Sequence, residues 1–298
     1  MDQIQFWNRE TQKLETERVY GDSAVKLVYQ NPVGRLLTDW VFAKKPISQL
    51  YGWMQAHPMS AKKVEPFIKR FGIPMEDFEG APFKSFNDFF VRKYKPGKRP
   101  FCTQPGDFSA PAEARYFAFD RLSRDSKLAV KGIELTPQGL LGSAKKAEPF
   151  EGGPGLLARL CPVDYHRYHY PDDGKTIDAY TIPGRFHSVN PIALEVQSDI
   201  LVSNERRVAI LETKNFGKVA YVEVGALFVG RIIQTHDESQ SFSRGQEKGM
   251  FLFGASTVII LGEPGRWIPD ADLLEQTKQG RESYVKIGTR VGRQKSNS

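Results

Sequence analysis

Apolar residues recur every three or four positions in the first third of the chain, in three stretches between residues 31 and 71. This spacing predicts three short amphipathic helices, with prolines near their starts. The apolar positions are Val33, Leu36, Leu37, Trp40 and Val41, then Ile47, Leu50, Tyr51 and Met54, then Val64, Phe67, Ile68 and Phe71. Because tryptophans and lysines are interleaved here, the helices suit either a membrane interface or a cap packed on the main domain.

Beyond Pro100 the pattern changes to short apolar or alternating runs bounded by Gly, Pro and Asp, which is typical of β-strands. In VAYVEV, residues 219–224, Glu223 stands between valines and predicts a half-buried strand. The predicted strands cover residues 114–120, 155–161, 200–203, 207–213, 218–233 and 257–261. The two regions together predict an α+β fold: an N-terminal amphipathic helical region (1–100), then a β-rich domain (101–298) with a mostly antiparallel sandwich or barrel-like core.

The stretch MFLFGASTVIILGEPG, residues 250–265, interrupts a strand pattern with Gly254, Ala255 and Ser256. Glycine inside a strand usually marks a β-bulge or the close approach of another backbone. The alternative is that the chain reacts with itself here, because the small residues leave the Ser256 hydroxyl an uncrowded backbone.

The charge balance, 42 Lys and Arg against 35 Asp and Glu, gives a net charge of +7 and favours an anionic partner. No basic run and no known motif points to nucleic acid, so we expect no nucleic-acid partner. Two cysteines are too few for a disulfide framework. With no signal-peptide pattern and no window of 18 uncharged apolar residues, we expect a cytoplasmic protein without a membrane span.

A second unusual stretch, CPVDYHRYHYP at residues 161–171, places Asp164, His166 and His169 within six positions. No cysteine or acidic cluster supplies the further ligands that a metal site needs, so we expect no metal. Hydrogen-bonded turn histidines and general acid–base catalysis remain as alternatives, and catalysis is favoured. With Ser256 as a hydroxyl, the set resembles a nucleophile, a base and an orienting acid.

Six motifs in register resemble phosphatidylserine decarboxylases, in the bacterial, chlamydial-type branch. They occur in the family's order between residues 84 and 262. The motifs are KSFNDFFVRKYKPGKRP (84–100), CPVDYHRYHYP (161–171), GRFHSVNP (184–191), NERRV (204–208), VAYVEVGALFVGRI (219–232) and FGAST (253–257).

The resemblance implies a carboxy-lyase that converts phosphatidylserine to phosphatidylethanolamine with a pyruvoyl group made from its own Ser256, without PLP or a metal. The chain would cut itself between Ala255 and Ser256, which gives a β chain (1–255) and an α chain (256–298) that stay associated. The same resemblance implies a homodimer, and a peripheral location on the anionic inner face of the cell membrane. The N-terminal helical region would then be the membrane-associating part, and residues 101–298 the catalytic domain.

The resemblance also implies roles for individual residues. His169 would be the base for self-cleavage, together with an acidic residue at Glu113, and His166 would handle the proton in decarboxylation. Asp164 would either hold the ring of His166 or be a structural carboxylate. Gly254 would keep the cleavage site open.

Departures from the family pattern fall on the chemical motifs. Glu113 and Ala114 stand where Asp and Gly are usual, and Ala255 replaces a glycine. Phe228 and Arg231 replace Asn and Ser. Because the serine and both histidines are present, we favour an enzyme over a paralogue that never matures and only binds lipid surfaces.

Two further alternatives concern the substrate and the site of the cut. A pyruvoyl enzyme could decarboxylate a soluble amino acid in place of a lipid. A second Gly-Ser pair, Gly142 and Ser143, is followed by Ala-Lys-Lys and predicts a loop or helix start, not a cleavage site.

Overall fold

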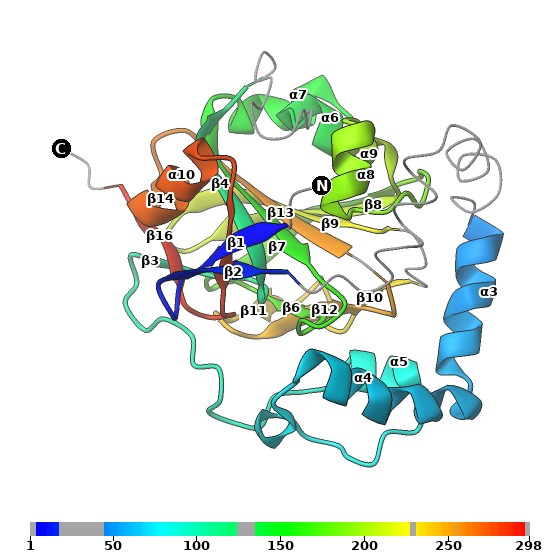
Figure 1. Cartoon of the computed structure of the whole chain (residues 1–298). Coiled ribbons are helices and arrows are strands. Elements are labelled where there is room, and N and C mark those ends of the chain that lie inside the picture. The colour runs from blue at the N-terminus through cyan, green and yellow to red at the C-terminus, as the bar shows by residue number, and fades with distance from the viewer. Residues whose placement is uncertain (1–3, 18–44, 124–134, 227–230, 255, 296–298) are drawn as a thin grey trace.

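The computed structural model describes residues 4–17, 45–123, 135–226, 231–254 and 256–295 (Figure 1). The first predicted helix, around residues 33–41, lies outside these residues. So do Phe228 and Ala255.

A ten-stranded sheet forms the centre of the molecule. Every pairing in it is antiparallel except that of β1 with β15, which is parallel. Its strands, in spatial order, are β11 (Ser241–Phe242), β7 (Gly174–Ile182), β8 (Arg206–Thr213), β9 (Gly217–Val224), β13 (Ser256–Gly262), β5 (Gly153–Leu160), β4 (Ala114–Leu122), β15 (Glu282–Val285), β1 (Gln5–Asn8) and β2 (Lys13–Thr16). The predicted α+β fold with a mostly antiparallel core is confirmed.

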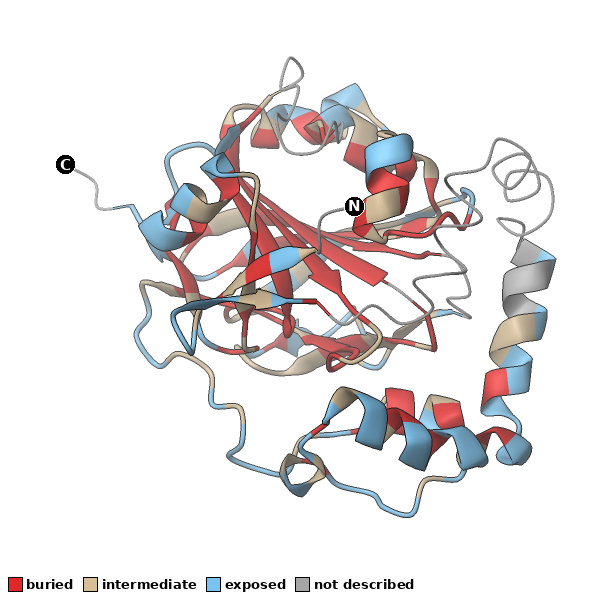
Figure 2. Cartoon of the chain, viewed as in Figure 1, coloured by how far each residue is buried: buried red, intermediate tan, exposed pale blue. Residues whose placement is uncertain are grey.

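Two three-stranded sheets accompany the central one. The first consists of β10 (Ile232–Gln234), β12 (Glu247–Phe251) and β6 (Arg167–His169), and the second of β14 (Trp267–Pro269), β16 (Arg290–Gln294) and β3 (Asp107–Ser109). The first sheet packs on the central one, since the rings of Tyr168 and Tyr221 lie 6.1 Å apart. Figure 2 shows that the central strands are the most deeply buried part of the fold.

Short helices surround this core at the upper and left sides of Figure 1. They are α6 (Pro137–Leu141), α7 (Ala144–Ala147), η4 (Glu148–Phe150), α8 (Pro191–Val196), α9 (Ile200–Ser203) and α10 (Ala271–Lys278). Gly142 ends α6 with a left-handed φ of 66°, and the Ser143 hydroxyl caps α7. This Gly-Ser pair is therefore a helix boundary, as predicted.

A separate helical arm lies below and to the right of the sheets (Figure 1). It contains α3 (Lys45–Ala56), η2 (Pro58–Lys63), α4 (Val64–Phe71), η3 (Met75–Asp77) and α5 (Phe86–Phe90). The second and third predicted helices are thus confirmed as α3 and α4. None of the helices in the described part of the chain has the length and apolar character needed to cross a membrane.

Three local predictions differ from the structure. Residues 200–203 form the helical turn α9 and not the predicted strand. The prediction failed because a four-residue apolar run does not distinguish a strand from a buried helical turn. The run 218–233 is not one strand, since β9 ends at Val224 and β10 begins at Ile232. The strand at 219–224 is buried on both faces, not half-buried, and its Glu223 pairs with Lys248 of β12.

The start of the chain also joins the main sheet. Residues 5–16 form β1 and β2, and β1 pairs with β15 near the other end of the chain. The sequence predicted no strand there, because its pattern is too short to show a period.

Candidate active site

The strand pattern breaks at residues 252–255 because the chain changes sheets there. β12 pairs with β6 and β10, whereas β13 lies between β5 and β9 in the central sheet. Gly254 has a φ of 146°, which side chains rarely allow. We call Leu252, Phe253 and Gly254 the corner. The β13 ladders run without a register shift, so the break is not a β-bulge in this strand.

Helix α5 anchors the corner from the helical arm. The side-chain oxygen of Asn87 accepts a hydrogen bond from the main-chain N–H of Phe253 at 2.9 Å. The ring of Phe253 packs edge-on against Phe86 and Phe90, with centroids 5.1 and 4.9 Å away, and Tyr51 of α3 lies at 5.9 Å. The arm therefore packs on the main domain directly at the corner.

Ser256 is the first residue of β13 and is fully buried. Its neighbour across β5 is Leu160. Within the described residues its hydroxyl has no hydrogen-bond partner. A buried hydroxyl normally finds a partner, so an unpaired one marks a candidate reactive group.

His166 lies beside the corner. Its main-chain oxygen accepts a hydrogen bond from Phe251, and its ring stacks on Phe90 with centroids 3.8 Å apart. Burial lowers the pKa of His166 to about 3 and the charge of Arg92 adds to this, while the carbonyls of Asp164 and Gly254 oppose it. The ring is therefore neutral at neutral pH.

The tautomer of His166 follows from its contacts. Nδ1 lies 3.1 Å from the main-chain oxygen of Asp164 and must carry the proton to donate to it. Nε2 then carries a lone pair, and it has no hydrogen-bond partner in the described structure. This nitrogen can accept a proton.

His169 has a similar tautomer but different surroundings. Its Nδ1 donates to the main-chain oxygen of Gly245 at 2.8 Å, and the Tyr165 hydroxyl lies 3.3 Å from Nε2. Phe101 packs on the ring with centroids 5.5 Å apart. Burial lowers the pKa of His169. In the described structure the His169 ring therefore contacts Gly245, Tyr165 and Phe101, and not the corner.

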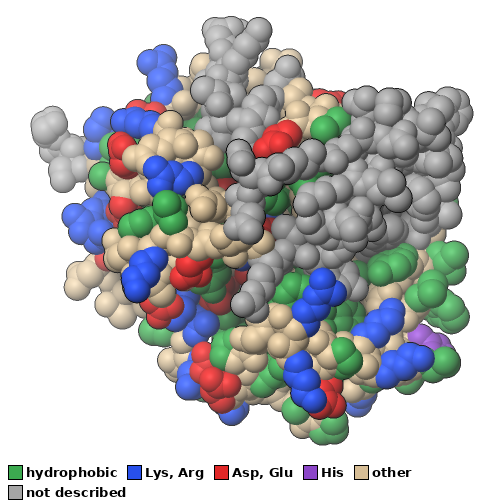
Figure 3. All heavy atoms as spheres, viewed as in Figure 1, with side chains coloured by type: hydrophobic (Ala, Val, Ile, Leu, Met, Phe, Trp, Pro, Cys, Tyr) green, Lys and Arg blue, Asp and Glu red, His purple; other side chains and the backbone are tan. Residues whose placement is uncertain are grey.

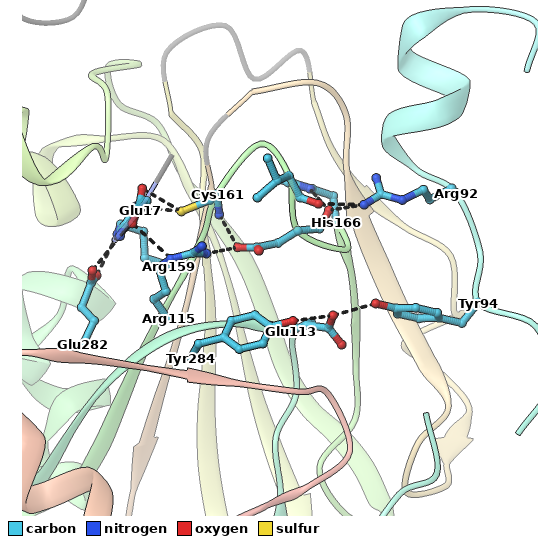
Figure 4. Close-up of polar contacts among 12 residues, drawn as sticks. Glu17, Arg92, Tyr94, Glu113, Arg115, Arg159, Cys161, His166, Glu282 and Tyr284 are labelled. Carbon is cyan, nitrogen blue, oxygen red and sulfur yellow. Dashed lines mark hydrogen bonds and ion pairs between the residues drawn. The ribbon is translucent and has the colours of Figure 1, made fainter. Parts of the chain in front are cut away.

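The Glu113 carboxylate is hydrogen-bonded by two tyrosines and an arginine, not by the histidines. Its carboxylate accepts hydrogen bonds from the Tyr94 hydroxyl at 2.6 Å and the Tyr284 hydroxyl at 2.8 Å (Figure 4). It also accepts from Arg99 Nε at 2.7 Å. Among the described contacts, none joins this carboxylate to either imidazole. The tilted rings of Tyr94 and Tyr165, with centroids 4.6 Å apart, lie between Glu113 and His169.

The Asp164 carboxylate contacts an arginine and a main-chain N–H, and no imidazole among the described contacts. It accepts from Arg115 at 2.6 Å and from the main-chain N–H of Cys161 at 2.7 Å, while only its carbonyl meets His166. Burial raises the pKa of Asp164, although Arg115 lowers it.

A buried ionic cluster continues from Arg115 (Figure 4). Arg115 Nε lies 3.1 Å from Glu17, and Arg159 joins Glu17 and Glu282 at 2.6 Å each. Burial raises the pKa of Glu17, but the two arginines outweigh it and hold that pKa well below its usual range. The N-terminal segment thus supplies a carboxylate to the arginines of β4 and β5.

Arg92 completes the support of the histidine loop and was not singled out by sequence reasoning. It donates to the main-chain oxygens of Val163 at 2.8 Å and Asp164 at 3.2 Å, so one carbonyl accepts from both Arg92 and His166. Asn87, Phe90 and Arg92 all belong to the SFNDFFVR stretch. The stretch belongs to one of the six motifs that carry the family resemblance, so the signal was present in the sequence.

A pocket of about 710 Å³ opens next to the corner. Its lining includes Trp53 of α3, Asn87 of α5 and Leu252 of the corner. Arg207 and Arg231 also line it. In the described residues no group of three or more His, Cys, Asp or Glu side chains is arranged to hold a metal ion.

Comparison with known proteins gives consistent matches. The family model for phosphatidylserine decarboxylase matches residues 86–293. The chain is 41% identical over 291 residues to a phosphatidylserine decarboxylase proenzyme of Clostridium novyi (strain NT), which covers 97% of this chain and 99% of the relative. Proenzymes of the same name from Desulfitobacterium hafniense (strain Y51) and Clostridium perfringens (strain SM101 / Type A) are 36% and 38% identical, each over 97% of this chain, and 98% and 99% of the relatives.

Proposed function

The chain belongs to the phosphatidylserine decarboxylase family, and from this premise we propose that it cuts itself before Ser256 and decarboxylates phosphatidylserine to phosphatidylethanolamine. The observation that carries the proposal is the buried, unpaired Ser256 hydroxyl directly after the corner. The name proenzyme, which the relatives carry, supports the cut.

The cut needs only groups of this chain and water. Ser256 Oγ attacks the carbonyl carbon of Ala255, and the amide becomes an ester. Elimination across the Cα–Cβ bond of Ser256 breaks the ester and leaves a carboxylate on Ala255. One water then enters and one ammonia leaves, which gives residue 256 a pyruvoyl end.

The residues around Ser256 fit such a group. The side chain is small and buried, and its oxygen competes with no other hydrogen bond among the described residues. Once formed, the pyruvoyl supplies the electron-accepting carbonyl that decarboxylation requires.

The two chains, residues 1–255 and 256–298, remain one folded body in this proposal. β13 is paired on both edges, with β5 and β9, and β15 lies between β4 and β1. Separation would break four strand pairings at the centre of the sheet, so a stable α/β heterodimer follows. A homodimer rests on the resemblance alone.

His166 is the imidazole that the geometry favours as base for the cut. Its neutral ring lies beside Gly254 and offers an unpaired Nε2 lone pair. The resemblance assigns that role to His169 and the proton of the decarboxylation step to His166, and both assignments remain predictions. Glu113 acts through Tyr94, which it anchors, not by direct contact with a ring.

We also propose that the helical arm attaches the protein to a membrane surface. Leu50, Trp53 and Met54 of α3 and Met59 of η2 are exposed, and lysines of η2 and α4 lie on the same arm (Figure 3). Exposed apolar side chains next to lysines suit an anionic lipid surface. Trp53 also lines the pocket, so a docked arm would bring lipid to the site. In this proposal residues 1–100 associate with the inner face of the membrane and residues 101–298 carry the chemistry, while β1 and β2 pair with the catalytic sheet.

The experiment follows the carboxyl carbon of the lipid. Purified protein is incubated with vesicles of phosphatidylserine labelled in that carbon. We expect labelled carbon dioxide and phosphatidylethanolamine from the wild type, and neither from Ser256→Ala. Preferential decarboxylation of free serine or tryptophan would identify a soluble amino acid as substrate, and vesicle binding without product would identify a lipid-binding paralogue.

A further inference from the structure

The register of four neighbouring strands places Arg207 on the same face of the sheet as Ser256. Arg207 lies opposite Thr181 of β7 and Glu223 of β9, and Glu223 lies opposite Val258 of β13. Directly opposite residues in antiparallel strands point to the same face, and so do residues two apart in one strand. Ser256, two positions before Val258, therefore shares the face of Arg207.

The preceding residue, Arg206, points to the other face. Its guanidinium donates to the main-chain oxygens of Leu140, Gly139 and Val202, which occupy it fully with structural contacts. Of the two adjacent arginines in the NERRV motif, only Arg207 lines the pocket.

The Arg207 side chain is held by an ion pair, but not all of its N–H groups are hydrogen-bonded. Its Nη2 pairs with Glu238, and Glu238 also accepts from Lys248 at 3.1 Å. Lys248 is in turn fixed by Glu223 at 2.7 Å. The Nε of Arg207 is buried and has no hydrogen-bond partner in the described structure. A buried guanidinium nitrogen without a partner is costly unless a ligand supplies one.

Arg231 provides a second guanidinium at the exposed rim of the same pocket. Its main-chain oxygen accepts from Leu252 of the corner at 3.1 Å, which ties its position to the cleavage segment. The pocket thus has one cation in its wall and one at its rim, next to the apolar side chain of Trp53.

We propose that Arg207 and Arg231 bind the phosphodiester of the lipid head group and so select a phospholipid over a free amino acid. The inference rests on the proposed function and adds the residues that recognise the head group of the substrate. Guanidinium groups match phosphate oxygens in geometry and charge. β8 and β13 are two strand spacings apart, about 10 Å, which a phosphoserine head group and an arginine side chain together can span.

The carboxylate is the other anion of this head group, and it is a poor partner for these arginines. It loses its charge when carbon dioxide leaves, so a guanidinium bound to it stabilises the substrate more than the transition state. The phosphodiester keeps its charge throughout the reaction. Arginines on the phosphodiester therefore strengthen binding without slowing the chemical step.

The test uses the full-length Ser256→Ala chain, which keeps the uncleaved fold, and glycerophosphoserine as a soluble probe without acyl chains. Isothermal titration compares this probe with L-serine in the parent and in added Arg207→Gln, Arg207→Lys and Arg231→Ser substitutions. We expect Arg207→Gln and Arg231→Ser each to weaken glycerophosphoserine binding about tenfold or more, and serine binding to stay unchanged. Arg207→Lys should lose less, because it keeps the charge.

The matched control is Arg266→Gln, an exposed arginine whose ion pair in the described part of the chain is with Glu263 at 3.6 Å. It should change neither affinity. Arg231 is exposed, so its variant keeps the fold even if Arg207→Gln does not. Equal affinities in all variants, or equal losses for serine, would overturn the assignment. In the cleaved enzyme, failure to convert any phosphatidylserine would refute the proposed function, whereas conversion with an unchanged KM in Arg231→Ser would refute only the head-group site.

Discussion

Asn87 and Phe253 lie 166 positions apart in the chain, yet the side-chain oxygen of Asn87 accepts the main-chain N–H of Phe253 at 2.9 Å. This bond joins the helical arm to the corner one residue before Gly254. A fixed backbone is what an attack by a neighbouring hydroxyl requires, because such reactions depend on close alignment. We therefore expect the arm to contribute to self-cleavage as well as to the proposed lipid contact.

Loss of the Asn87 acceptor should slow self-cleavage. Asn87→Leu leaves the Phe253 N–H without its partner, and a misplacement of about 1 Å at the corner costs roughly a hundredfold in rate. The fraction of uncleaved chain over time, read on a denaturing gel, measures the effect. Asp88→Asn, on the exposed side of the same helix, is the control and should cleave at the normal rate.

The two histidines can be separated by the same assay. General base catalysis contributes roughly 10² to 10⁴ in rate, so we expect His166→Ala to remain uncleaved while the wild type is complete. His169→Ala should still cleave, because its ring contacts Gly245 and Tyr165. His236→Ala, whose ring contacts Tyr170, controls for the loss of an imidazole. If only His169→Ala blocks the cut, His169 is the base and the geometric assignment of His166 is wrong.

Stability should depend on pH through His166. Burial lowers its pKa from 6.5 to about 3, so between these values the unfolded chain binds a proton that the folded chain does not. The free energy of unfolding therefore has its full value with respect to this ring above pH 6.5. It decreases as the pH falls toward 3, by at most about 1.4 kcal/mol per pH unit. Urea unfolding of the Ser256→Ala chain with and without His166→Gln measures it. The double variant should lose less stability on acidification, and an equal loss would contradict the buried neutral ring.

Membrane binding should depend on the exposed side of α3. Leu50 and Trp53 are 57% and 65% exposed, and burial of such a side chain in lipid is worth about 1.5 to 3 kcal/mol. Replacing both with serine should weaken binding to phosphatidylserine vesicles by roughly a hundredfold or more. Ile177→Ser, 44% exposed on β7, is the matched control in a sedimentation assay. Unchanged binding of the double variant would place the membrane contact elsewhere on the chain.

The sequence predicted much of this fold because its periods are clear. Helical spacing identified α3 and α4, and apolar or alternating runs identified five of the ten strands of the central sheet, β4, β5, β8, β9 and β13. A four-residue apolar segment does not show whether it forms a strand or a helical turn, so α9 was expected as a strand. The strand around Glu223 was expected to be half-buried, because the pairing of Glu223 with Lys248 depends on a second sheet that no local pattern reveals.

The candidate site was predicted by residue type but not by arrangement. Ser256 and His166 both lie near the corner, since His166 accepts from the main chain of Phe251 and Ser256 begins β13. Glu113 was expected to orient His169, yet its carboxylate faces Tyr94, Tyr284 and Arg99, because spacing along the chain does not give side-chain direction. Arg115, which holds Asp164, carried no signal of its own in the sequence.

The central claim is that Ser256 becomes the first residue of a separate chain, and intact mass under denaturing conditions tests it most directly. The account predicts two species divided between Ala255 and Ser256, with the smaller one lighter by one ammonia than simple hydrolysis would leave it. Ser256→Ala should remain a single chain. A wild-type protein that stays at 33.7 kDa on long incubation would contradict the account and make Glu113, Ala114 and Ala255 the first residues to revert to the family pattern.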